Sequence, residues 1–198
     1  MENQLIAMRS AISDSIRVKQ SILQDERLLH EVVTVGRLMS DVVKRGNRVL
    51  FAGNGGSAAD AQHLATEFVS RFDFDRPGLP ALSLTTDTSM ITAISNDYGY
   101  DQLFKRQLEA QARHGDMFVG ITTSGRSKNI LAAFETCKSL GVISVALCGM
   151  TGVLEDLVDH VIRVPSQSTP RIQEAHILLG HILCAQVELT LFAHLKPV

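Results

Sequence analysis

The fold is decided by the stretch RVLFAGNGGSAAD, which runs from Arg48 to Asp60. Its first half is an apolar run typical of a strand buried on both faces, and its second half is a glycine-rich turn that leads into a helical pattern. Such a turn lets backbone N–H groups face an anion at the positive end of the helix. It lacks the Gly-Lys-Ser/Thr ending of a Walker A loop and the glycine spacing of a dinucleotide-binding fold. Glycine spacing alone is therefore compatible with a phosphate-binding loop and with a plain tight turn.

The same order of apolar run, polar turn and helical pattern recurs along the chain. The apolar runs are residues 48–52, 81–84, 117–121, 142–147 and 160–164. Strands that alternate with helices form a parallel sheet with right-handed crossovers and helices on both faces. We therefore predict an α/β fold, a three-layer sandwich around a central five-stranded parallel sheet, with a ligand site at the carboxyl ends of the strands.

Helical patterns occupy both ends of the chain. Residues 1–45 carry apolar side chains at spacings of three and four, with a break near Asp25 and an end at Gly46. Residues 171–195 show the same spacing and are predicted to form one long terminal helix. Because no linker, low-complexity tract or repeat divides the chain, we expect residues 1–198 to form a single domain with a helical extension at its start.

The composition excludes several classes of function. The 198 residues include 19 basic and 21 acidic side chains without a basic stripe, so nucleic acid is not an expected partner. Polar residues interrupt the apolar runs before the ~20 residues of a membrane span, and the N-terminus shows no signal pattern, so we predict a cytoplasmic protein without a membrane partner. The cysteines Cys137, Cys148 and Cys184 match neither a disulfide framework nor a zinc-knuckle spacing and are interpreted as buried thiols.

A second polar turn, from Thr122 to Asn129, follows the third predicted strand. Its hydroxyl and backbone donors suit the same kind of anion, although serine and threonine are also ordinary N-cap residues. Because both turns follow parallel strands, we expect them at the same edge of the sheet, which favours a phosphorylated ligand. Further candidate anion partners, each also explained as a surface charge, are Arg71, Arg76, Arg126 and Arg171.

Two predicted helices carry candidate ligand or acid–base groups. His63 and Glu67 lie about 40° apart around one helix and share a face. Gln173 and His181 lie about 80° apart on the terminal helix, whereas His176 is about 140° from His181. If the helices meet, His63, Glu67, Gln173 and His181 suit zinc or a similar ion, or act without metal as a carboxylate base and an imidazole acid. A solvated helix face is the more frequent explanation of a His-x-x-x-Glu spacing, and spacing does not decide between these interpretations.

Motifs in four parts of the chain, in the right order, resemble the phosphoheptose isomerase family of the sugar isomerase (SIS) fold. They are GNGGS at 53–57 with DAQH at 60–63 and Glu67; RPGLPA at 76–81 with TTDT at 85–88 and NDY at 96–98; TSG at 123–125 with Ser127; and RVP at 163–165 leading to RIQE at 171–174 and His181. The likeness extends from about residue 45 to the C-terminus. Taken without the resemblance, residues 85–88 are explained in part as a capping cluster and residues 96–99 as a turn.

The resemblance implies an isomerase that converts sedoheptulose 7-phosphate into D-glycero-D-manno-heptose 7-phosphate through an enediol(ate), the first step toward activated heptose for lipopolysaccharide core or surface polysaccharide. It implies Glu67 as the base and His181 as the partner acid or base. It also implies one zinc per subunit, held by His63, Glu67, Gln173 and His181. The implied assembly is a homotetramer with sites between subunits, in which residues 1–45 pack.

The resemblance also assigns positions that contact the phosphorylated seven-carbon substrate. They are Asn54, Gly55, Gly56, Ser57, Glu67, Asn96, Asp97, Thr122, Thr123, Ser124, Ser127 and Gln173, with Asp60, Arg71, Thr86 and Asp87 beside them. A noncatalytic branch of the fold binds the bacterial replication initiator and lacks the carboxylate and the second histidine, whereas Glu67 and His181 are both present here. Another phosphosugar isomerase or a sugar-phosphate sensor is the further alternative. Arg126 and Lys128 depart from the family pattern and leave the details of the substrate open.

Overall fold

The computed structural model describes residues 1–197, and its centre is a parallel sheet with the strand order β2-β1-β3-β4-β5. The strands are β1 (Val49–Gly53), β2 (Ala81–Ser83), β3 (Met117–Thr122), β4 (Ile143–Cys148) and β5 (His160–Arg163). Each predicted strand is confirmed to within one residue at either end. Every residue of β1 and β3, which lie inside the sheet, is buried, as expected for strands covered on both faces.

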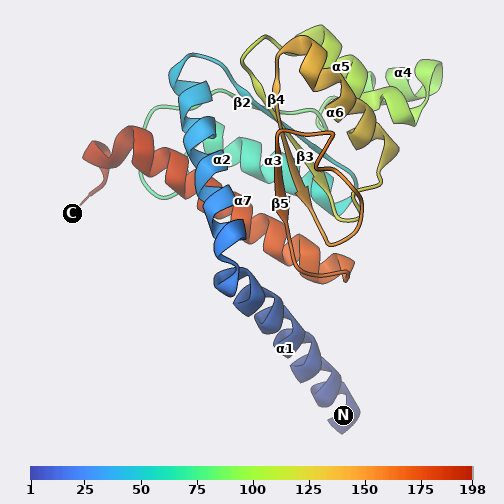
Figure 1. Ribbon diagram of the computed structural model, residues 1–198, viewed down its shortest axis with the longest axis vertical. Helices are drawn as coiled ribbons and strands as arrows, with labels where there is room; N and C mark the ends of the chain where they lie inside the picture. Colours follow the sequence, from blue (N-terminus) through green and yellow to red (C-terminus); the bar gives the residue numbers. More distant parts are fainter. Residues whose placement is uncertain (198) are drawn as a thin grey trace.

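Helices cover both faces of the sheet and confirm the three-layer prediction (Figure 1). They are α1 (Glu2–Gln24), α2 (Glu26–Lys44), α3 (Gly56–Val69), α4 (Thr88–Tyr98), α5 (Leu103–Gln111), α6 (Lys128–Leu140) and α7 (Thr169–Phe192), with short 3₁₀ helices η1 (Tyr100–Gln102) and η2 (Ala193–Leu195). Val49 and Phe51 of β1 pack with α2, α3 and α7, whereas Leu50 and Ala52 pack with α5 and α6. The alternation of side chains along β1 therefore divides the core into two halves.

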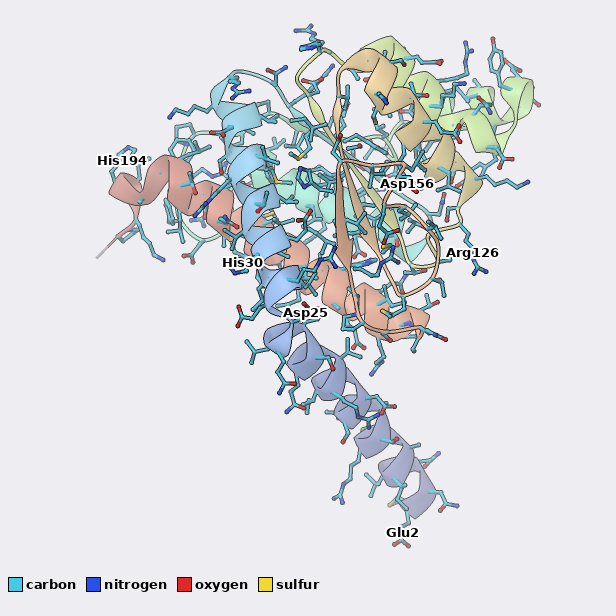
Figure 2. All side chains as sticks on the ribbon, viewed as in Figure 1. Glu2, Asp25, His30, Arg126, Asp156 and His194 are labelled. Carbon is cyan, nitrogen blue, oxygen red and sulfur yellow. The ribbon has the colours of Figure 1, made fainter. Side chains whose placement is uncertain are left out.

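The N-terminal helices are separated at Asp25, where the sequence predicts a break. The Asp25 carboxylate accepts a hydrogen bond of 3.0 Å from the backbone N–H of Leu28 and so caps α2. Gly46 follows the end of α2 with a φ of 81°, as expected for a glycine beyond a helix. Helix α1, which precedes Asp25, extends away from the rest of the molecule (Figures 1 and 2), and Ile22 is its single buried residue.

The terminal helix α7 is longer and more apolar than we expected of any segment in this chain. By length and composition alone, residues Thr169–Leu195 could cross a membrane, contrary to the expectation that every apolar run is too short. Leu179, Leu183 and Val187 of α7 are nevertheless buried in the core half formed with α2 and α3. This burial in the fold explains the apolar face of α7.

The two predicted anion turns lie at one edge of the sheet. β1 and β3 are parallel neighbours, and Gly53 pairs with Ile121 at their carboxyl ends. The glycine loop after β1 and the hydroxyl loop after β3 (Thr122 to Ser127) consequently emerge side by side, as predicted. We call this the site edge of the sheet.

Candidate active site

The glycine loop provides open backbone donors where α3 begins. Gly55 is the N-cap of α3 and has a φ of 56°, a left-handed conformation that favours glycine. At Gly56 a Cβ atom would lie 2.5 Å from Nε2 of Gln173, so the amide of Gln173 occupies the space that a side chain would need. The loop therefore combines free N–H groups with the positive end of a helix, which suits an anion.

A pair of asparagines joins the glycine loop to helix α6. Asn54 and Asn129 exchange two amide hydrogen bonds of 2.9 Å each, and Asn129 is buried. The hydroxyl of Tyr100 donates to Oδ1 of Asn54 at 2.8 Å and so attaches η1 to the same group. The sequence places Asn129 in the second polar turn without a role of its own, and no motif points to Tyr100. An amide side chain on the mostly apolar buried face of α6 is the signal that would have indicated the role of Asn129.

The hydroxyl loop is held by its own side chains. Oγ1 of the buried Thr122 lies 3.1 Å from Oγ of Ser127, the N-cap of α6, and Ser124 Oγ accepts a hydrogen bond from the backbone N–H of Arg126. Ser127 caps the helix without a side-chain bond to it. Arg126 is exposed and points outward (Figure 2). Its charge thus lies on the surface beside the loop.

A triad of His63, Glu67 and His181 forms where α3 meets α7. The Nε2 atoms of His63 and His181 lie 2.9 Å apart, and His63 Nε2 lies 3.3 Å from Oε1 of Glu67. The three ligand atoms all lie within 4.8 Å of one another. The condition set by the sequence, that the two helices meet, is fulfilled for these three residues.

The donor set of the triad fits a divalent cation. Donors that hold zinc tetrahedrally at 2.0–2.1 Å lie about 3.3 Å from each other, close to the separations found here. Burial, followed by the proximity of His63, lowers the pKa of His181, and Glu67 acts in the opposite direction. A lowered pKa keeps this imidazole neutral, which is the form that coordinates a metal or accepts a proton.

Asp60 lies one turn before His63 on α3. Burial raises the pKa of this carboxyl group, whereas His63 lowers it by a smaller amount, and Oδ2 of Asp60 is buried without a hydrogen-bond partner. An unpaired buried oxygen of this kind is available to a ligand or a water molecule. Asp60 therefore stays a candidate contact beside the triad.

Two other polar residues of α7 are not members of the triad. Gln173 lies beside Gly56, and eight residues separate it from His181, about 12 Å along the helix axis. His176 is buried, neither ring nitrogen has a hydrogen-bond partner, and burial lowers its pKa to about 4. His181 rather than His176 therefore lies with His63 and Glu67. The place of Gln173 in a four-ligand set stays a prediction.

Other predicted residues have local structural roles. Asp87 caps α4 by accepting from the backbone N–H of Met90 at 2.8 Å, and Thr86 Oγ1 donates to the backbone of Ser83. Asn96 and Asp97 bond to each other on the exposed helix α4. The capping interpretation is therefore confirmed for Asp87.

Two of the candidate anion-binding arginines are already paired, and the cysteines are buried. Arg76 is buried against Glu188, so its interpretation as a free anion partner is wrong. Arg171 pairs with Glu174 at 2.7 Å.

Cys137, Cys148 and Cys184 are all buried, and burial raises the pKa of these thiols to about 12, about 11 and about 12, respectively. The interpretation of the cysteines as buried structural thiols is confirmed.

The parallel sheet with its two loops is the fold of a SIS domain, and residues 14–149 match the family model described as SIS domain. Phosphoheptose isomerase of Aneurinibacillus thermoaerophilus is 59% identical over 93% of this chain and 94% of its own, and phosphoheptose isomerase 2 of Campylobacter jejuni is 56% identical over 97% and 96%. The solved phosphoheptose isomerase of Francisella tularensis has a TM-score of 0.88 and 36% identity over 93% of this chain and 97% of that chain.

The chain accordingly belongs to the phosphoheptose isomerase family. It is an enzyme of the aldose–ketose isomerase type, which confirms the enzyme prediction over the noncatalytic alternative.

Proposed function

We propose that the protein converts sedoheptulose 7-phosphate into D-glycero-D-manno-heptose 7-phosphate. The observation that carries this proposal is the meeting of Glu67 and His63, on the helix that begins at the glycine loop, with His181 of α7. The names of the relatives, phosphoheptose isomerases, supply the seven-carbon phosphosugar class of substrate. The reaction is the first step toward activated heptose for lipopolysaccharide core or surface polysaccharide and takes place in the cytoplasm.

The phosphate is held at the site edge by neutral donors. The backbone N–H groups of Gly55 and Gly56, the hydroxyl of Ser57 and the hydroxyls of the loop after β3 supply them, and the positive ends of α3 and α6 add to the attraction. The remaining contacts to the sugar are assigned to Asn54, Asn96, Asp97, Thr122, Thr123, Ser124, Ser127 and Gln173. This arrangement binds an anion without a cluster of basic residues, in agreement with the net charge of −2.

Two residues move the protons. Glu67 removes the proton from C1 of the ketose, and the electron pair of that C–H bond forms the C1–C2 double bond of an enediol(ate). His181 transfers a proton between O1 and O2, and Glu67 returns its proton to C2, which gives the aldose without net loss of protons or electrons. The lowered pKa of His181 leaves it neutral and ready to accept a proton.

We further propose that the triad holds one zinc ion per subunit, with Gln173 as the fourth ligand. When bound there, zinc positions the oxygens of the substrate and stabilises the negative charge that develops on them. The Glu67 carboxylate cannot coordinate tightly and accept a proton from carbon at the same time, because both use its oxygen lone pairs. Assays with and without a chelator therefore distinguish a metal that turnover requires from a metal that only changes its rate.

The assembly is proposed to be a homotetramer with sites between subunits. Four apolar side chains of α1, Leu5, Met8, Ile12 and Ile16, are each about half exposed and recur on one face of the helix. A stripe of this kind is normally covered by another protein surface, and a second copy of α1 is the simplest cover. Residues 1–198 then form one domain whose first 45 residues pack in the tetramer.

A direct assay tests the proposed reaction. The purified full chain is incubated with sedoheptulose 7-phosphate, with added zinc and separately with a chelator, and the aldose phosphate is detected by a coupled enzyme. Fructose 6-phosphate serves as the six-carbon control. Turnover of the seven-carbon ketose alone supports the proposal. Turnover of the six-carbon ketose alone would contradict the substrate, and no turnover in either condition would contradict the function.

A further inference from the structure

A buried ion pair behind the triad joins α7 to the loop of residues 70–80, which connects α3 with β2. Nε of Arg76 lies 2.9 Å from Oε1 of Glu188, and the two side chains are 2% and 1% exposed. Glu188 lies on α7 seven residues after His181, which is two turns further on nearly the same side of the helix. Glu188 therefore lies on the same rigid element as His181 and ties that element to Arg76.

Arg76 holds the end of the helix that carries Glu67. Its Nη2 donates to the backbone carbonyl of Glu67 at 2.7 Å, and its Nη1 donates to the carbonyl of Phe68 at 2.7 Å. Carbonyls in the last turn of a helix have no partner within the helix, and a cation there also interacts favourably with the helix dipole. Arg76 thereby fixes the backbone position from which the Glu67 carboxylate extends.

Glu188 holds the residue that packs against His181. Its two carboxylate oxygens accept hydrogen bonds from the backbone N–H of Phe72 at 3.0 Å and of Asp73 at 2.8 Å. The ring centroid of Phe72 lies 5.3 Å from that of His181. The same carboxylate that pairs with Arg76 consequently determines where the aromatic neighbour of the imidazole lies.

Stability alone is a weak reason for a buried pair of this kind. Removing two charges from water is costly, and apolar side chains of similar volume are often as stabilising as the ion pair. A planar guanidinium that bonds one carboxylate and several carbonyls at once provides fixed geometry, which apolar packing does not. The contacts of this ion pair reach two members of the triad, Glu67 through its backbone carbonyl and His181 through Phe72.

We propose that Arg76 and Glu188 are positioning residues of the isomerase, which align Glu67 through its backbone and His181 through Phe72. This inference rests on the proposed roles of Glu67 and His181. Neither Arg76 nor Glu188 touches the substrate in this scheme. Their loss is expected to slow the proton transfers while leaving the phosphate loops intact.

The test compares two variants of this network with one variant of a similar ion pair elsewhere in the molecule. R76K keeps a positive charge but cannot bond Glu188 and both carbonyls in the same planar geometry. F72L keeps the backbone bonds to Glu188 and removes the ring beside His181. The control is R48K, because Arg48 pairs with the buried Asp116 at 3.2 Å, where β3 begins and away from the site edge.

The measurements are kcat, KM, thermal midpoint and zinc affinity in competition with a chromophoric chelator. We expect R76K and F72L to lower kcat or zinc affinity about 10- to 100-fold with little change in KM, and R48K to lower the thermal midpoint alone. Unchanged kcat and zinc affinity in folded R76K and F72L would overturn the inference, as would an equal loss of kcat in R48K. If R76K does not fold, F72L decides the outcome. An inactive wild-type protein would instead refute the proposed function.

Discussion

The Nε2 atoms of His63 and His181 lie 2.9 Å apart, although 118 positions of sequence separate the two residues. Two neutral imidazole nitrogens at this distance need a proton or a cation between them, because their lone pairs otherwise face each other. The carboxylate of Glu67 adds negative charge at 3.3 Å from His63. The arrangement therefore attracts positive charge to the point where α3 and α7 meet.

The first prediction concerns metal content. Protein purified without chelator is expected to contain about one zinc per chain by elemental analysis, since the triad supplies three ligands of a tetrahedral set. H63A is expected to lose the metal, because two of the closest donor contacts involve His63. H30A, a substitution on the exposed face of α2 (Figure 2), is the control and should retain it. Equal zinc content in both variants would refute the site.

The second prediction concerns the base. E67Q is expected to lower kcat by at least about 100-fold, because an amide cannot accept the proton from carbon. Substrate binding, measured by calorimetry on the inactive variant, should change little, since the phosphate is held elsewhere. E109Q, at an exposed glutamate of α5, is the matched control and should retain full activity. Full turnover by E67Q would place the base elsewhere.

The third prediction concerns the asparagine pair. N129A leaves the Nδ2 donor of the half-buried Asn54 without its partner, whereas Oδ1 still accepts from Tyr100, so the cost in stability is at most about 1–3 kcal/mol, that of an unsatisfied buried group. We expect KM for the phosphosugar to rise about tenfold, because the glycine loop loses its connection to α6. Y100F removes one exposed hydrogen bond to the same asparagine and should have a smaller effect. An unchanged KM in N129A would show that the pair does not align the loop.

The fourth prediction concerns stability toward acid. Burial lowers the pKa of His176 from 6.5 to about 4, and the backbone of Cys148 opposes this to a smaller extent. The unfolded chain therefore binds a proton between these pH values when the folded chain does not. Stability is complete above pH 6.5 and falls as the pH drops toward 4, by on the order of 3 kcal/mol.

Chemical denaturation at pH 7 and at pH 4.5 measures this loss. H176L removes the titrating group, so it should show a smaller decrease between the two pH values than the wild type. Comparing the two proteins cancels the contribution of other titrating groups. Parallel decreases in both would mean that His176 does not contribute.

The fifth prediction concerns assembly. I12E introduces a charge into the apolar stripe of α1 and is expected to dissociate the oligomer, as measured by light scattering after size exclusion. S10E, about 160° away around the same helix, is the matched control and should leave the assembly intact. A wild-type protein that is monomeric at micromolar concentration would contradict the proposed tetramer. An intact I12E oligomer would show that α1 packs through another face.

Local sequence signals predicted the fold because they coincide with local physical causes. Apolar runs gave the strands, and Asp25 and Gly46 mark helix ends because a cap and a left-handed turn each depend on one residue. The sequence predicted that His63 and His181 meet only on the condition that their two helices pack together. Helical periodicity indicates which side chains share a face of one helix, but it does not indicate which helices pack against each other.

Other parts of the site depend on tertiary packing. Arg76 was interpreted as an anion partner because a single arginine gives no sign of its burial, and Glu188 was not singled out although it lies on the buried face of α7 with Cys184 and Val187. A charged residue on an apolar face is the pattern that would have indicated a buried partner. The identity of that partner, Arg76, is determined by the course of residues 70–80 and has no signature in the sequence.

Helix α7 carries Gln173, His176, His181 and Glu188 on one continuous element of 24 residues. Deleting or inserting one residue between Gln173 and Glu188 would rotate everything beyond it by about 100° and shift it by about 1.5 Å. The glycine loop, the triad and the buried ion pair would then lose their common alignment in a single step. Length variation among functional homologues should consequently be confined to positions outside this helix. Within the helix, point substitutions are tolerated on the exposed side, but insertions and deletions are not.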